Sequence, residues 1–563
     1  TDSDGTVADI GAYPYLNSYS GPTWYIAESG NDTTATGASD DPFRSIQAGI
    51  NFSSDDDSVT VAAGTYVENI NFRGRNIKVV GEDRETTIID GNQNGSVVTI
   101  NNNESNTAIL KYFTIQNGYQ SGTGYVEGLG HIGRGGGIFI RDASPNLLGL
   151  IVRDNLAEDM GGGISIDGYY DNPVLDSLYI IDNIANSMGG GIFTGSADGN
   201  TIIRATTLVS NTANYGGGIT LHGEVSFHNS VVNNNVATVS GGGIRVQTDR
   251  DITISNTLFS GNQSVSGGAM ELFYSSGIIL DNLTISDNIA FVQGGAVFCS
   301  ESENISISNT VIHNNGSQSI SFNPVDGQNT LSFAYSNIQG GQDSIGVNDN
   351  GTITWGSGNI DVDPMFVDTA NGNYHLLASS QLINAGHPDS TDSDGTVADI
   401  GAYPYLNSYS GPTWYISESG NDTTATGTST DPFRSIQAGI NFSSDNDSIT
   451  VAAGTYIENI IIDNKTIDIA GVDPNSTIIN GNNTGSVIAL HGSPNASKIS
   501  GFTITGGTGI YTSDGEGGGI YIGLVSGGPV IDNCIVTGNS EGAFFFKGES
   551  TIMNTLIHGN DKS

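Results

Sequence analysis

The sequence is poor in basic residues, and this limits the partners we expect for it. Its 563 residues include 17 Lys plus Arg against 59 Asp plus Glu, which gives a formal net charge of −42. Such a chain has little with which to neutralise phosphates, so we expect no nucleic-acid partner and no binding to an anionic membrane by charge. An acidic surface suits a saline or calcium-containing exterior, where ions screen its self-repulsion.

Cysteine and long apolar runs are scarce as well. The two cysteines, Cys299 and Cys534, lie too far apart in sequence for a disulfide framework, and we expect them to be small buried side chains. No apolar run approaches the roughly 20 residues of a membrane-spanning helix, so we expect no membrane span in this segment. The chain begins at Thr1 without a signal peptide and stops at Ser563 in the middle of a repeat. We therefore expect a processed piece of a longer protein.

What the sequence does contain is repetition on two scales. Residues 1–70 and 391–460 are identical at 64 of 70 positions, and the copies then diverge but remain alignable. The larger unit is therefore 390 residues long. We predict that residues 1–20 are the C-terminal tail of a preceding unit, that residues 21–410 are a complete unit, and that residues 411–563 begin the next one.

A shorter repeat inside the unit is marked by glycine clusters. GGGI and its variants GGAM and GGAV recur at steps of 26, 28, 27, 25, 26 and 27 residues. The clusters begin at Gly135, Gly161, Gly189, Gly216, Gly241, Gly267 and Gly294. A period of about 20–50 residues indicates a solenoid or a propeller. The residues that follow each cluster alternate, as in Ile138/Ile140 and Met270/Leu272, which predicts strands with one buried face.

Other residue types form columns with the same period. One asparagine column comprises Asn155, Asn183, Asn211, Asn235, Asn262, Asn288 and Asn315, and a second comprises Asn229, Asn256, Asn282 and Asn309. Apolar residues stand three and eight positions before each member of the first column. Coils stacked about 4.8 Å apart would bring like residues together, with an aliphatic core, an asparagine ladder, and glycines at corners that need positive φ or close backbone approach.

These columns predict an all-β fold, a right-handed parallel β-helix (β-solenoid) in tandem units. The crossover rule for parallel strands favours the right-handed winding. Within the complete unit we expect an N-terminal strand and capping helix over 21–57, β-helix coils over 58–345 and an irregular closing segment over 346–410. We expect roughly a dozen coils between Val59 and Gln339, in a rod of roughly 55–60 Å.

The stretch WYIAESGNDTTATGASDDPFRSIQAGINFSSDDDSVTVAAGTYVENI, from Trp24, closely resembles the N-terminal region of secreted pectate-lyase-like right-handed β-helix proteins. In that family the PF-x-SIQ segment is a short helix that caps the first coil. Here Asp41 and Pro42 predict the helix start, with Asp as N-cap. The stretch DPMFVDTANGNYHLL, from Asp363, resembles the closing segment of the same proteins. The resemblance implies fold and secretion; the fold hosts lyases, hydrolases, adhesins and fibres.

The junction between units contains a candidate calcium site. Its sequence HPDSTDSDGTVAD has the D-x-D-G pattern that can wrap calcium with carboxylates and carbonyls, with Gly395 allowing the turn. The predicted ligands are Asp389, Asp392, Asp394 and Asp399, with Asp2, Asp4 and Asp9 in the earlier copy. The alternative is an acidic turn that serves only the backbone. Bound calcium would be structural and would stiffen the join.

No strong catalytic motif appears in the sequence. The outward column beside the glycine clusters reads Phe139, Ser165, Phe193, Thr220, Arg245, Glu271 and Phe298. The one reactive-looking patch along these coils comprises His222, Glu224, Arg245, Asp249 and Glu271. We treat His222, Arg245 and Glu271 as weak catalytic candidates, because Arg245 beside Glu271 is more simply a cross-strand ion pair.

Exposed aromatic side chains are a further candidate for binding. Phe139, Phe193, Phe298, Tyr169 and Tyr170 would stack on sugars or pack between filaments if they are exposed, or are ordinary surface residues.

These observations favour an extracellular structural protein over an enzyme. The sequence where one unit meets the next is nearly identical in the two copies, whereas the sequence further into each unit diverges. This suggests that the geometry of the connection between units matters more than one particular surface. Our leading hypothesis is a cell-surface fibre, sheath or adhesive stalk, with neighbouring units head to tail and identical chains as filament partners. The alternatives are a carbohydrate-binding adhesin at the cell surface, marked by a groove of exposed aromatic residues, and a polysaccharide lyase or glycoside hydrolase, marked by an outward acidic cluster with a basic partner.

Overall fold

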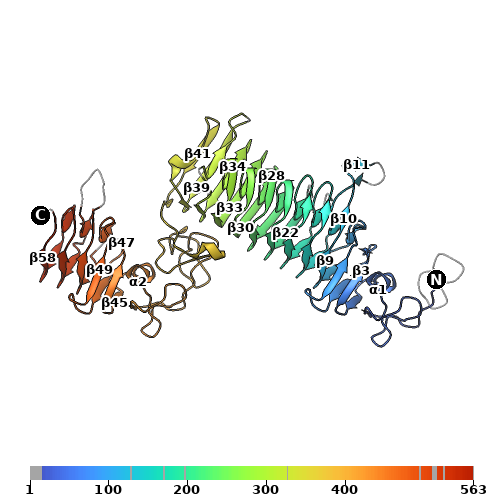
Figure 1. Cartoon of the computed structure of the whole chain (residues 1–563), viewed down its shortest axis with the longest axis horizontal. Coiled ribbons are helices and arrows are strands. Elements are labelled where there is room, and N and C mark those ends of the chain that lie inside the picture. Colours follow the sequence, from blue (N-terminus) through green and yellow to red (C-terminus); the bar gives the residue numbers. More distant parts are fainter. Residues whose placement is uncertain are drawn as a thin grey trace. The chain divides into compact units, whose positions relative to one another are not determined.

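The computed structural model describes residues 15–126, 130–168, 171–195, 198–316, 318–325, 327–492, 496–509, 517–523 and 527–561. The chain forms two compact units, Thr1–Asp361 and Val362–Ser563. Each is a stack of short parallel strands, so the predicted parallel β-helix is confirmed. In Figure 1 the strands of the first unit lie side by side from β3 (Gly64–Val67) to β41 (Gly351–Trp355).

The largest sheet of the first unit contains two strands from most coils. Its other members are β1 (Thr23–Ile26), β2 (Ser58–Val61), β5 (Lys78–Gly81), β6 (Thr87–Asp90), β8 (Ile109–Lys111), β9 (Thr114–Gln116), β14 (Asn146–Leu148), β15 (Ile151–Arg153), β18 (Val174–Asp176), β19 (Tyr179–Ile181), β22 (Asn200–Arg204), β23 (Thr207–Val209), β26 (Glu224–His228), β27 (Val231–Asn233), β30 (Ile252–Ser260), β33 (Ile278–Ser286), β36 (Ile305–Ser308), β37 (Val311–His313), β39 (Asn329–Ala334) and β40 (Asn337–Ile338). From β2 to β39 this stack has eleven rungs, close to the dozen coils expected between Val59 and Gln339. The predicted end of the coils at residue 345 is wrong, because β41 pairs with β39 and adds a twelfth rung beyond it.

A ten-stranded sheet follows the glycine clusters. Its strands are β4 (Ile70–Asn71), β7 (Val98–Ile100), β13 (Ile138–Ile140), β17 (Ile164–Ile166), β21 (Ile192–Thr194), β25 (Ile219–Leu221), β29 (Ile244–Val246), β32 (Met270–Phe273), β35 (Val297–Ser300) and β38 (Ile320–Phe322). The register pairs Ile138 with Ile164 and Ile140 with Ile166, so each aliphatic column is continuous and buried. This burial of apolar surface drives the stacking.

A seven-stranded sheet closes the coils on the third side. Its strands are β10 (Tyr119–Gln120), β16 (Leu156–Ala157), β20 (Ile184–Ala185), β24 (Thr212–Tyr215), β28 (Val236–Ser240), β31 (Gln263–Ser266) and β34 (Ile289–Gln293). The inward column of this sheet is alanine or serine, as in Ala185, Ala213 and Ser264. The described part of this unit also contains an antiparallel pair, β11 (Tyr125–Val126) and β12 (Gly130–His131), and a 3-10 turn, Gln342–Ser344.

Single residues with positive φ turn the chain at the corners of each coil, both within the largest sheet and between sheets. The second asparagine column occupies one corner, with φ of 53° at Asn229 and 48° at Asn256. Asparagine visits this conformation more readily than most residues, which explains the column. The first glycine of each cluster forms another corner, as at Gly189 with φ 64°. The second approaches the next coil: a Cβ on Gly162 would lie 2.5 Å from the Gly190 carbonyl oxygen.

The first asparagine column forms the predicted ladder inside the coil. Each amide Nδ2 donates to the Oδ1 of the asparagine in the next coil, at 2.9–3.0 Å from Asn155 through Asn315. The same Oδ1 atoms also accept backbone N–H groups, as from Asn211 to Asn235. These side chains are 0–1% exposed, so the ladder satisfies polar groups that would otherwise be buried without partners.

A short helix caps the first coil of each unit: α1 (Ile46–Phe52) and α2 (Ile436–Phe442). The predicted start at Asp41 and Pro42 is wrong, because the N-cap is Ser45, whose side chain accepts the Ala48 N–H. Asp41 instead accepts the Thr36 N–H. Glu68 accepts the Ile46 and Gln47 N–H groups, at 2.8 and 3.0 Å, and so satisfies donors of the first turn.

The second unit repeats this architecture. A six-stranded sheet comprises β44 (Thr413–Ile416), β45 (Ser448–Val451), β48 (Asp468–Gly471), β51 (Lys498–Ser500), β54 (Val530–Asp532) and β57 (Thr551–Met553). A five-stranded sheet comprises β46 (Gly454–Ile457), β49 (Thr477–Asn480), β52 (Thr503–Thr505), β55 (Ile535–Thr537) and β58 (Leu556–His558). A four-stranded sheet comprises β47 (Ile460–Asp463), β50 (Ile488–His491), β53 (Ile520–Ile522) and β56 (Phe544–Phe546).

The junction segment, residues 362–410, folds with the solenoid that follows it. It contains a small antiparallel pair, β42 (Phe366–Asp368) and β43 (Asn373–Leu376), joined by the 3-10 turn Thr369–Asn371. Asn441 of α2 donates to the carbonyls of Ala378 and Ser380 at 3.0 and 2.8 Å. Residues 346–410 are predicted as the closing segment of the preceding unit, whereas these contacts hold residues from 362 onward on the cap of the next. Among the described residues, no helix is long and apolar enough to cross a membrane.

Candidate functional site

The three weak catalytic candidates lie on neighbouring coils of the ten-stranded sheet. The outward column has the predicted register, with Thr220 opposite Arg245 and Arg245 opposite Glu271. Arg245 Nε lies 3.3 Å from Glu271 Oε2, and the two side chains are 6% and 7% exposed. The predicted cross-strand ion pair is therefore confirmed. It is enclosed rather than presented to solvent.

Aromatic rings enclose this ion pair. The guanidinium of Arg245 lies over the rings of Tyr215 and Phe273, at 4.3 and 4.5 Å from their centroids. Ser240 Oγ donates to Glu271 Oε2 at 2.5 Å, and burial raises the pKa of this carboxyl despite the neighbouring arginine. An ion pair sandwiched between rings in this way stabilises one packing arrangement. It leaves little access for a substrate.

His222 follows β25 and is partly buried. Its ring meets the edge of Phe193 at 5.2 Å between centroids. Burial, and then the positive charge of Arg245, lower its pKa to about 4. Of the other patch members, Glu224 is exposed, and the side chain of Asp249 is 90% exposed. The five predicted residues therefore do not form one open site.

The neutral state of His222 predicts a pH dependence of stability. Its folded pKa of about 4 lies below the ordinary value of 6.5, so the unfolded chain takes up the proton first. We expect this contribution, about 3 kcal/mol in full, to be lost as pH falls from about 6.5 to about 4. Urea unfolding at several pH values, for wild type and His222→Gln, measures it. If the free energy of unfolding depends on pH in the same way for the two proteins, His222 is not the group responsible.

The aromatic residues proposed as exposed are mostly covered. Phe193 and Phe298 are 3% and 6% exposed, and Arg134 and His222 pack against the Phe193 ring. Phe139 is half-buried under the Arg141 guanidinium, 4.8 Å from its ring centroid. Tyr169 and Tyr170 lie outside the described residues. A sugar-stacking surface from the three phenylalanines is therefore wrong.

The predicted calcium ligands of the junction segment lie in one compact turn. Asp392 accepts the Asp399 N–H at 2.8 Å, and Asp394 accepts the N–H groups of Thr396 and Asn407. Asp399 accepts the N–H groups of Asn384 and Tyr405, at 2.7 Å each. Burial, with smaller contributions from Asp392 and Asp394, raises its pKa to about 7.

This arrangement does not fit a metal ion as it stands. The carboxylates serve backbone donors, Asp389 is exposed, and within the described ranges no three His, Cys, Asp or Glu side chains are grouped to hold a metal. The earlier copy, Asp2, Asp4 and Asp9, lies outside the described residues. Calcium at the join stays a prediction.

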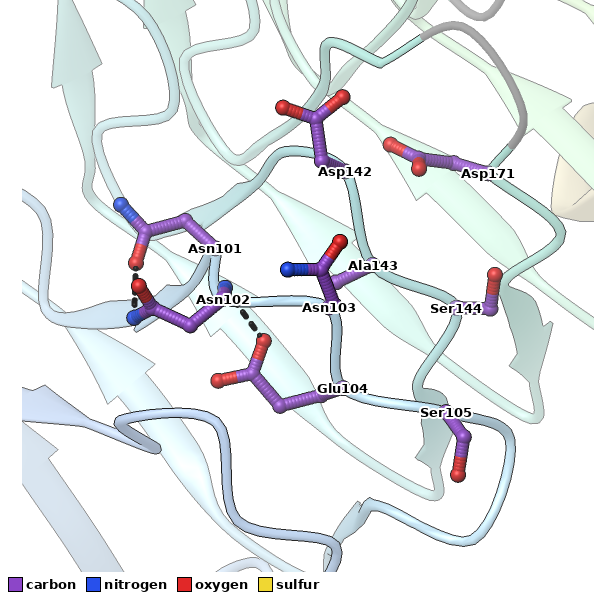
Figure 2. A pocket seen from close by; sticks show the side chains of 9 residues that line it. All are labelled: Asn101, Asn102, Asn103, Glu104, Ser105, Asp142, Ala143, Ser144 and Asp171. Carbon is purple, nitrogen blue, oxygen red and sulfur yellow. Dashed lines mark hydrogen bonds between the residues drawn. The ribbon is translucent and has the colours of Figure 1, made fainter.

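Sequence reasoning missed a polar depression formed by three successive loops after the ten-stranded sheet. Its volume is about 460 Å³. Figure 2 shows the lining residues, namely Asn101, Asn102, Asn103, Glu104, Ser105, Asp142, Ala143, Ser144 and Asp171. Glu104 accepts the N–H groups of Gly74 and Asn102, at 2.8 and 2.7 Å, and is therefore held by the backbone. Asp142 and Asp171 lie at the opposite side of the view.

Asp171 is the most perturbed group of this depression. Burial and the nearby negative charge of Asp142 raise its pKa to about 7, although backbone N–H groups of Ala143 and Asp142 favour its charged form. A carboxyl with a raised pKa beside a second carboxyl suits general acid–base chemistry, while the backbone contacts suit a turn-stabilising role. The sequence does contain one sign of this depression, namely acidic residues that recur a few positions beyond successive strands.

Comparison with known proteins agrees with the architecture. A family model described as a right-handed β-helix region matches residues 205–364, and a model of a protein family of unknown function, DUF1565, matches residues 418–461. The second match covers the cap of the second unit. Comparison with curated proteins finds no match.

Several solved structures are similar at low identity. Pectate lyase Pel9A is 14% identical, with a TM-score of 0.39, over 68% of this chain and 96% of the other. The PL6 family alginate lyase AlyGC is 12% identical, with a TM-score of 0.31, over 95% and 80%. The GH136 lacto-N-biosidase from Eubacterium ramulus is 12% identical, with a TM-score of 0.32, over 60% and 68%. Likeness at this level says nothing of activity.

The matched region and the stacked parallel strands define the class of protein. The chain is a right-handed parallel β-helix protein.

Proposed function

We propose that this chain is part of an extracellular structural protein in which β-helix units follow one another head to tail as a surface fibre, sheath or adhesive stalk. The observation that carries the proposal is the way the end of the junction segment is attached to the cap of the next solenoid. Chain continuity ties this segment to the unit before it. Its side chains tie it to the unit after it.

The same attachments occur at both copies. Tyr405 Oη donates to the Ala425 carbonyl at 2.7 Å, as Tyr15 Oη does to Ala35. Three further hydrogen bonds of the second copy have an equivalent in the first. Asn407 donates to Thr426 as Asn17 does to Thr36, and Tyr409 donates to Thr413 as Tyr19 does to Thr23. Trp414 donates to Asp447 as Trp24 does to Asp57. A repeated, hydrogen-bonded join with aromatic packing suits a structural role.

Electron microscopy of the native full-length protein tests this proposal. We expect strings one solenoid wide, with an axial period of one unit. Imaging with a calcium chelator tests the predicted metal at the joins, where loss of calcium is expected to shorten or kink the strings. Compact, separate particles would contradict the structural role.

A second candidate function is binding or cleavage of a glycan at the polar depression. The observation that favours it is Asp171, with a pKa of about 7, beside Asp142 in an open polar hollow. A protonated Asp171 would serve as a general acid while a second carboxylate stays ionised. On this account activity falls as pH rises through about 7.

Asp171→Asn tests this candidate. Wild type and variant are compared for cleavage of neutral and acidic polysaccharides. Removing a general acid lowers turnover by about 100-fold or more, so we expect the variant to cleave the wild-type substrate slower by that factor. Asp249→Asn, at an exposed carboxylate on the same unit, is the matched control and should leave the rate unchanged. If wild type cleaves none of the polysaccharides, the candidate is eliminated.

A further inference from the structure

The outer face of the seven-stranded sheet carries a strip of exposed apolar side chains, which we name the apolar strip. Its members are Ile184, Val236, Val265, Ile289, Phe291 and Val292, from β20, β28, β31 and β34. Phe291 and Val292 are 73% and 68% exposed. Exposed apolar side chains that gather on one face of a protein mark an interaction site more often than scattered single residues do.

The strip follows the stacking of the coils. Ile184 pairs in register with Thr212, Thr212 with Val236, Val236 with Gln263, and Gln263 with Ile289. This column therefore places Ile184, Val236 and Ile289 on alternate coils, with the partly exposed Thr212 and Gln263 on the coils between them, and successive coils lie about 4.8 Å apart. Two such faces can interdigitate as sheets do when they pack face to face.

The absence of charged residues on this face indicates which partner it fits. The strands β20, β24, β28, β31 and β34 contain no Asp, Glu, Lys or Arg, in a chain of net charge −42. A basic partner would be drawn to the carboxylates elsewhere and would gain nothing from this strip. Two copies of the chain repel each other through most of their surfaces, and here they can meet without bringing carboxylates together.

We propose that the apolar strip is a lateral docking surface for the same strip of a second copy of this chain. The pairing is isologous, with the two copies related by a two-fold axis. The inference rests on the proposed structural function and deepens it, since strings that associate side by side form a sheath or bundle rather than separate fibres.

The size of the strip sets the strength of the pairing. The face that carries the strip runs from β20 to β34 and includes β24, which contributes no apolar member. Five strands at about 4.8 Å and about four residues at about 3.3 Å cover about 300 Å² on each copy. A stable complex buries about 800 Å² per partner, so one strip pairs weakly. Strings that carry several strips would associate far more strongly, because each pairing after the first is intramolecular.

Sedimentation of the 563-residue chain at increasing concentration tests the proposal. We expect the average mass to rise toward that of a dimer as the concentration approaches about 1 mM, and to rise further in about 0.5 M salt, which screens the carboxylates. The double variant Phe291→Asp/Val292→Asp should stay monomeric under both conditions. Val67→Asp is the matched control, because Val67 is 64% exposed but lies outside the strip, and it should behave as wild type.

Each remaining outcome contradicts the proposal. A wild-type chain that stays monomeric at every concentration overturns it, as does equal loss of association in Val67→Asp. Retention of the wild-type monomer on an insoluble polysaccharide, lost in the double variant, would assign the strip to a glycan instead. Electron micrographs separate this inference from the proposed function: single strings that never associate laterally would keep the structural role and overturn the docking surface.

Discussion

Replacing Asn235 with alanine is expected to lower the free energy of unfolding of the unit Thr1–Asp361 by on the order of 4 kcal/mol. Asn235 is a middle rung of the ladder. Its Oδ1 accepts the backbone N–H and the Nδ2 of Asn211, and its Nδ2 donates to the Leu208 carbonyl and to Asn262 Oδ1, all at 2.9–3.0 Å. The variant loses four buried hydrogen bonds and leaves donors and acceptors without partners.

Chemical denaturation followed by circular dichroism measures this loss. Asn214→Ala is the matched control, because Asn214 lies on the same coil as Asn211 but is exposed and bonds to the Asn186 carbonyl at the surface. We expect the control to lose at most about 1 kcal/mol. Equal losses in the two variants would show that the ladder contributes no more than a surface amide does.

Removing one partner of the buried ion pair is expected to have a similarly large effect. Glu271→Ala leaves the guanidinium of Arg245 buried between two rings without its counter-charge, and such variants lose about 3–5 kcal/mol of stability. Replacing both partners by apolar residues of similar volume is often nearly neutral. We therefore expect the double variant Arg245→Met/Glu271→Leu to be more stable than Glu271→Ala.

The same denaturation measurement distinguishes a structural pair from a catalytic one. If the pair is structural, Glu271→Ala is the least stable of the three proteins. The double variant is then either intermediate in stability or more stable than wild type. A Glu271→Ala protein as stable as wild type would contradict the enclosed geometry. It would also return His222, Arg245 and Glu271 to consideration as an accessible site.

Much of the solenoid could be predicted from the sequence because stacking turns sequence period into spatial contact. Every coil places the same residue type at the same corner. The ladder is therefore predicted by the column of Asn155, and two corners are predicted by the column of Asn229 and the glycine clusters. The outward column from Phe139 to Phe298 was also predicted in register. Periodicity carries this information without knowledge of the loops.

Burial of the outward side chains could not be predicted in the same way. Alternation separates inward from outward residues, but it does not say that Phe193, Phe298 and the Arg245–Glu271 pair are buried. The helix start was misplaced because Asp41 and Ser45 are both good caps, and the choice depends on the parallel bridge between Phe43 and Ile26. The depression around Asp171 depends on loops that differ from coil to coil.

The contour length of particles, measured by electron microscopy as a function of the number of 390-residue units, tests the central claim most directly. Proteins with one, two and three complete units are compared under the same conditions. The account predicts that each unit adds the same length, about 4.8 Å per coil, while the width stays that of one solenoid. Particles that remain compact and grow equally in all directions as units are added would contradict it.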